Sequence, residues 1–64
     1  MNAAPPVARL EAAKRAYKAG TAGARAVIAT AVGEVEATVV DLGEGVFAFT
    51  RGAPVVAPVV VRWL

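Results

Sequence analysis

Chemistry in this chain would have to come from a short set of side chains. The hydroxyl nucleophiles are threonines and the acids are five carboxylates: Thr21, Thr30, Thr38, Thr50, Glu11, Glu34, Glu36, Asp41 and Glu44. Nucleophilic catalysis of the usual kind places Ser or Cys beside a base. The sequence has no Ser, Cys or His, and no threonine is N-terminal. We therefore predict no catalytic residues and no enzyme activity.

The carboxylates do not form a pair or a ligand set. Glu34 is expected in a turn, and Glu36 and Asp41 are expected on opposite faces of one strand, which opposes shared acid–base work. A metal would have only these carboxylates to bind. The Gly-rich stretches 20–23 and 43–45 match neither phosphate-loop pattern. We predict no metal site, no cofactor and no small-molecule ligand.

Length and composition point to self-association. The 64 residues suffice for one domain, 1–64, and 58% are hydrophobic. A domain of this size buries only about 60% of its unfolded surface. Without cysteine, disulfides cannot supplement the core, so we predict a homo-oligomer that buries the apolar excess.

Charge and hydropathy limit the classes of partner that the chain could bind. The net charge is +2 and the seven basic residues are scattered, so we expect no nucleic-acid footprint. Neither a signal peptide nor an apolar stretch of about 20 residues is visible. We expect a soluble chain without a membrane partner, cytoplasmic if expressed in a cell.

One helix is predicted at the start. After a frayed segment 1–4, Pro5-Pro6 can open a helix over 7–19, and Gly20 suits the position that ends it. Leu10 and Tyr17 lie on its apolar side.

Four antiparallel strands are predicted after the loop 21–23. They cover 25–32, 35–42, 46–51 and 55–63. The turns are expected at Gly33-Glu34, at 43–45 and at 52–54, because Gly and Pro favour chain reversal. Pro58 inside the fourth run indicates an edge or a bulge. The fold class is therefore α+β, an N-terminal helix followed by a four-stranded antiparallel meander.

Closing each hairpin on its turn sorts the side chains onto two faces. One face is the expected core beneath Leu10 and Tyr17: Ile28, Val32, Val35, Val39, Phe47, Phe49, Val55, Val59, Val61 and Trp63. Asp41 is also expected on this face, where its carboxylate must lie at a solvent-exposed margin or cap a turn. The other face is also largely apolar, and one short helix cannot cover both. It must meet another subunit, or the sheet must curl into a small barrel. The predicted subunit interface is Val27, Ala29, Val40, Val46, Ala48, Val56 and Val60.

The composition resembles that of computationally designed proteins. The sequence holds 16 Ala and 12 Val but no Ser or Gln, in keeping with design procedures that favour strong helix formers and β-branched strand residues. A GC-rich genome would explain the enrichment but not the missing Ser. The resemblance implies a designed self-assembling scaffold with no natural biochemical function.

A second resemblance is topological. A helix before a strand meander, with Arg51-Gly52 closing the third strand and Val55-Val56 starting the fourth, looks like the Sm-like RNA-binding fold. That family forms rings by edge-strand pairing. Of its base-binding Asp and Asn, Asp41 is present, but the only Asn is Asn2. Two alternatives to a designed scaffold therefore stay open: a small Sm-like nucleic-acid-binding ring protein and a natural protein-interaction module.

Overall fold

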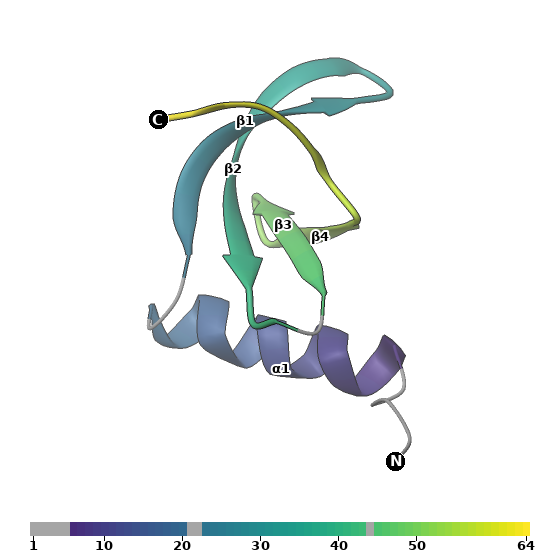
Figure 1. Ribbon diagram of the computed structural model, residues 1–64, viewed down its shortest axis with the longest axis vertical. Helices are drawn as coiled ribbons and strands as arrows, with labels where there is room; N and C mark the ends of the chain where they lie inside the picture. The colour runs from purple at the N-terminus through teal and green to yellow at the C-terminus, as the bar shows by residue number, and fades with distance from the viewer. Residues whose placement is uncertain (1–5, 21–22, 44) are drawn as a thin grey trace.

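The helix forms where the sequence predicts it. The computed structural model describes residues 6–20, 23–43 and 45–64. Helix α1 spans Pro6–Ala19 and crosses one end of the sheet (Figure 1). Gly20 ends it with a φ of 67°, and its N–H donates to the Tyr17 carbonyl oxygen at 3.2 Å. The expected frayed start 1–4 and residues 21 and 22 of the expected loop lie outside the described residues.

Five antiparallel strands follow, not four. They are β1 (Ala24–Thr30), β2 (Gly33–Asp41), β3 (Val46–Thr50), β4 (Ala53–Val56) and β5 (Val59–Trp63). Their order in the sheet is β4-β3-β2-β1-β5, so β4 and β5 are the outer strands. The α+β class and the antiparallel sheet are confirmed, whereas the predicted strand count is wrong.

The extra strand arises at Ala57-Pro58, where the predicted fourth strand is broken. Ala57 has a φ of 51°, outside the extended region, and its N–H bonds to the Val46 carbonyl oxygen at 3.3 Å. The chain leaves the β3 side of the sheet at this corner and returns beside β1 as β5. Pro58 therefore lies between two strands and not inside one.

The β1–β2 turn also differs from the prediction. It lies at Ala31-Val32, and Glu34 belongs to β2 opposite Ala29. The Thr30 hydroxyl donates to the Gly33 carbonyl oxygen at 2.7 Å and accepts the Val32 N–H at 3.2 Å. This side chain holds the turn two residues earlier than Gly33-Glu34 would place it.

The β2–β3 register corrects the predicted faces. Val40 lies opposite Phe47 and Val39 opposite Ala48, one residue away from the predicted pairing. Asp41 explains the difference, because its Oδ1 accepts the Gly43 N–H at 2.8 Å and begins the reversal after Asp41. A one-residue shift exchanges the faces of every side chain on a strand. The expected turn 43–45 includes residue 44, which lies outside the described residues.

Two apolar clusters result, one on each side of the sheet. The helix cluster joins α1 to the sheet and consists of Ala13, Val40, Phe47 and Phe49, with Leu10, Ala16 and Tyr17 at its margin. The inner cluster consists of Ala26, Ile28, Ala37, Val39 and Ala48, with Val35, Val55 and Val60 at its margin. Leu10 and Tyr17 meet Phe47 and Phe49 as predicted, but Ile28 and Val39 lie on the opposite side of the sheet.

The sheet curls around the inner cluster. Val55 of β4 and Val60 of β5 come from opposite outer strands and pack against the same buried residues. Curling therefore covers the face that α1 leaves free, as the alternative of a small barrel anticipated. The barrel stays open, because β4 and β5 do not pair with each other.

Phe49 is expected to be the most sensitive single position of the fold. Its ring is 2% exposed and stacks on Tyr17 with ring centroids 4.5 Å apart. Phe49→Ala should lower the free energy of unfolding by about 3 to 5 kcal/mol, since it removes the stack and leaves a cavity. Urea denaturation followed by circular dichroism measures this. The control Val32→Ala alters a side chain that is 90% exposed and should cost less than about 0.5 kcal/mol. Similar losses in the two variants would contradict the helix cluster.

Candidate functional site

The side chains that could take part in chemistry are dispersed over the surface, and most of the carboxylates form ion pairs with nearby basic side chains. Glu11 pairs with Lys14 at 3.3 Å, Glu34 with Arg62 at 3.7 Å and Glu36 with Arg25 at 2.9 Å. Asp41 caps its turn, as the sequence suggested it could. Residues 6–20, 23–43 and 45–64 contain no group of three His, Cys, Asp or Glu side chains that could hold a metal. The candidates Thr21 and Glu44 lie outside the described residues.

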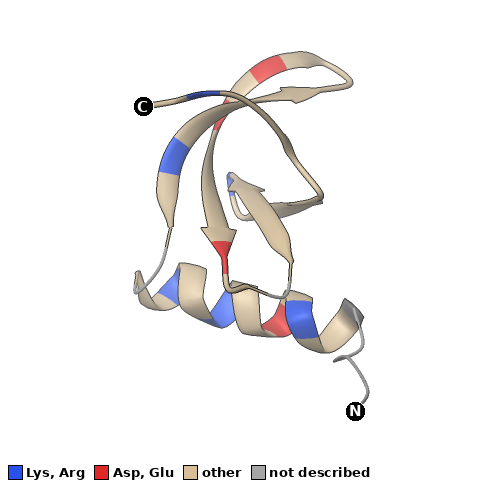
Figure 2. Cartoon of the chain, viewed as in Figure 1, with Lys and Arg blue, Asp and Glu red and all other residues tan. Residues whose placement is uncertain are grey.

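Exposed apolar side chains are the most prominent surface feature. Several lie on the last third of the chain: Val46, Val56, Val59, Val61, Trp63 and Leu64. Trp63 is 60% exposed and Val56 is 67% exposed. In Figure 2 the charged residues lie mainly on α1 and on the β1–β2 hairpin, while β4 carries none and β5 only Arg62. The outer strands are therefore the least polar part of the described surface.

Four of the exposed apolar residues were predicted to lie in the core. Val32, Val59, Val61 and Trp63 were expected in the core and are exposed, so that prediction is wrong. Their positions follow from the early β1–β2 turn and from the separate strand β5.

The predicted interface residues are divided between surface and interior. Val27, Val40 and Ala48 are buried within the single chain and have no surface to offer a partner. Ala29, Val46 and Val56 are exposed, and Val60 is half-buried at the margin of the inner cluster. Contact of these four residues with a second copy stays a prediction.

Each outer strand also has unpaired backbone groups. The Leu64 N–H donates to the Arg25 carbonyl oxygen at 3.0 Å, so the backbone of Leu64 faces β1 and that of Trp63 faces outward. The bond from Ala57 to Val46 sets the same alternation on β4, where Pro54 and Val56 face outward. Pro54 lacks an N–H and is tolerated on this edge.

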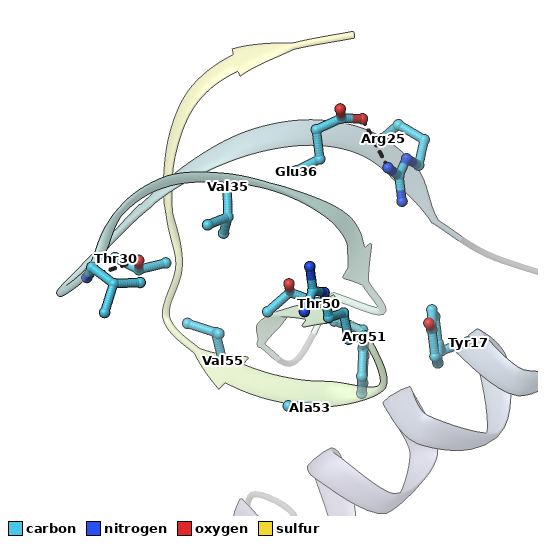
Figure 3. Close-up of a pocket in the computed structure, with 11 residues that line it drawn as sticks. Tyr17, Arg25, Thr30, Val35, Glu36, Thr50, Arg51, Ala53 and Val55 are labelled. Carbon is cyan, nitrogen blue, oxygen red and sulfur yellow. Dashed lines mark hydrogen bonds and ion pairs between the residues drawn. The ribbon is translucent and has the colours of Figure 1, made fainter.

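A cleft with a volume of about 970 Å³ lies between the two hairpins. We call it the β2 cleft. Its walls include Val35 and Glu36 of β2, Val55 of β4, and Arg51 in the β3–β4 turn. Figure 3 shows these side chains around the space, with Tyr17 of α1 at one end. Clefts of this size accommodate small ligands or short peptide segments. The cleft could not be predicted from the sequence, because it depends on Gly33 and Glu34 belonging to β2 and not to the turn before it.

Arg51 is the unusual residue of this cleft. It has a φ of 53° and Gly52 has a φ of 82°, two consecutive positive values that are typical of a type I′ turn. Thr50 pairs with Ala53, so the turn lies at Arg51-Gly52 and the predicted turn at 52–54 is wrong. Asn or Gly is favoured at the first of these positions. Within the described part of the chain, Arg51 forms no ion pair, whereas Arg25 across the cleft is bound to Glu36. Among the described residues that line the β2 cleft, Arg51 thus carries a guanidinium without an ion-pair partner.

Comparisons with known proteins do not assign a family. No family model, no curated protein and no solved structure matches this chain. Among the described residues, no helix has both the length and the apolar character needed to cross a membrane.

Replacing Arg51 should show that the turn does not require it. We expect Arg51→Asn to raise the free energy of unfolding by about 1 kcal/mol, because Asn adopts positive φ more readily than Arg. Urea denaturation measures the change. A lower stability would mean that the Arg51 side chain contributes to the fold.

Proposed function

We propose that this chain is a self-assembling structural protein, of designed origin, without catalytic activity or a bound cofactor. Its composition supports the designed origin. The dispersed carboxylates support the absence of acid–base chemistry. The exposed valines, Trp63 and Leu64 support assembly, because the free energy falls when a second copy covers water-exposed apolar side chains.

The observation that carries the proposal is the coincidence of apolar side chains with free backbone edges. Val56 on β4 and Trp63 on β5 combine exposed side chains with outward-facing N–H and C=O groups. An exposed apolar edge favours pairing with another strand. Because two different strands are available, we propose head-to-tail joining of β4 in one copy to β5 in the next, which closes a ring if the rotation between copies allows it. A two-fold dimer joining like edges is the alternative arrangement.

The first prediction concerns mass. Light scattering on dilute protein should give a molecular mass of two or more times 6.5 kDa, in whole multiples. A folded monomer at micromolar concentration would refute assembly.

The second prediction separates the two arrangements. Val56→Lys and Trp63→Lys each place a charge on one outer strand. Head-to-tail joining needs an intact β4 and an intact β5, so each variant alone should be monomeric. Since each variant keeps one intact edge, an equimolar mixture should form a heterodimer of twice 6.5 kDa, measured by native mass spectrometry. If like edges pair in a two-fold dimer, the variant that keeps the pairing edge should remain a dimer by itself. The mixture should then contain no heterodimer.

A matched control is available at the β1–β2 turn. Val32 is more exposed than Val56 or Trp63 and lies on neither outer strand, so Val32→Lys should assemble normally. Disassembly of the control would show that added charge alone prevents association.

The second candidate is a small Sm-like nucleic-acid-binding ring. It is favoured by Arg51 beside Tyr17 in the β2 cleft, since a cation and an aromatic ring together suit a phosphate and a base. Retention on immobilised single-stranded RNA that falls steeply with salt would support this candidate. Equal flow-through of the chain at low and high salt would exclude it.

A further inference from the structure

The β2 cleft contains a third free strand edge. Pairing of β3 with β2 ends at Thr38 opposite Phe49, whereas β2 begins at Gly33. The first half of β2 is therefore paired with β1 only, within the described residues. This half faces the cleft, with the β3–β4 turn at its closed end.

The backbone groups on that edge can be assigned from the register. The Val46 carbonyl bonds to Ala57, so the Val46 backbone faces β4 and those of Phe47 and Phe49 face β2. Thr38, opposite Phe49, faces β3 in return. Backbone direction alternates with a period of two, so Glu36 and Glu34 direct their N–H and C=O groups into the cleft.

The side chains of these two residues leave the edge accessible. Glu36 is held by Arg25 of β1 and Glu34 by Arg62 of β5. Both arginines lie on strands on the far side of β2 from its free edge. The half-buried Val35 and Val55 line the cleft and supply an apolar wall for alternate side chains of an added strand.

The closed end of the cleft determines which part of a peptide it can hold. A strand lying along β2 from Gly33 cannot continue past Glu36, because β3 occupies the next positions. A chain terminus must therefore lie near Arg51, whose guanidinium has no carboxylate partner among the described residues. A cation there favours a C-terminal carboxylate over an N-terminal ammonium group.

We propose that the β2 cleft binds the C-terminal segment of an extended, apolar peptide. The peptide lies parallel to β2, bonds to the backbone of Glu34 and Glu36, and places its terminal carboxylate on Arg51. Strand addition with carboxylate capture is a recurrent mode of peptide recognition. The site lies apart from the outer edges of β4 and β5, so it does not depend on the proposed assembly.

The test uses the full chain and a synthetic probe, acetyl-Thr-Val-Thr-Val with a free carboxylate, against the same peptide amidated. Titration followed by amide NMR should shift the Glu34 and Glu36 resonances. The amidated peptide should bind about tenfold more weakly or worse, since it loses a charge-assisted bond.

Arg51→Asn is the protein-side test, because it keeps the turn and removes the guanidinium. It should reduce affinity for the free-acid peptide to that of the amide, while the control Arg15→Asn, which makes the same charge change on exposed α1, leaves it unchanged. Equal affinity for acid and amide, or an unchanged Arg51→Asn, would overturn the proposal.

Three further results would also overturn it. Hexanoate binding as tightly as the peptide would indicate an anion site without strand addition. Oligouridylate shifting the same resonances more strongly would assign the cleft to nucleic acid. Glu34 and Glu36 resonances that move with protein concentration alone would assign it to a second copy.

Discussion

The pairing of β2 with β3 determines how the apolar residues are divided. Val40 opposite Phe47 places both aromatic rings of β3 beneath α1, and Val39 opposite Ala48 leaves only a methyl group on the other face. A shift of one residue would direct the rings into a space now filled by small side chains. Interiors are close-packed, so overfilling of that kind is destabilising. The Asp41 cap therefore influences both clusters, although Asp41 itself is exposed and belongs to neither.

Small side chains on the inner face allow the sheet to curl. Ala26, Ala37 and Ala48 are fully buried there, and their low volume lets the two outer strands approach the same cluster. The corner at Ala57-Pro58 then separates two short strands in place of one long strand. Curling accordingly covers the second face, which is one of the two alternatives that the sequence left open for it. Much of the exposed apolar surface that remains lies on β4 and β5, the outer strands of the sheet, and these edges are the surfaces best suited to contact a second copy.

Features with a local cause could be predicted from the sequence. Pro6 and Gly20 marked the ends of the helix, because their backbone preferences act at their own positions and need no distant contact. The β-branched residues indicated the strands. The registers could not be predicted, because side-chain bonds of Thr30 and Asp41 and an arginine at positive φ moved three turns by one or two residues. Side chains alternate between the two faces of a strand, so a register error of one residue exchanges the faces. The predicted interface therefore mixed buried residues such as Val40 with exposed ones such as Val56. The β2 cleft arises because the early β1–β2 turn adds Gly33 and Glu34 to β2, beyond the end of its pairing with β3, and that turn position was not predicted.

The three free edges are not equivalent, and the difference is physical. The edges of β4 and β5 are flanked by exposed valines and Trp63, with Arg62 as their one charged residue. They suit a large, apolar and repeated partner such as another copy of the chain. The free edge of β2 is short, is bordered by ion pairs and ends at a cation. A whole subunit pairing there would bring its own sheet against the β3–β4 turn, whereas a single strand end needs only the width between the hairpins. Recessed edges near an unpaired charge favour small partners, and outer edges with apolar margins favour assembly.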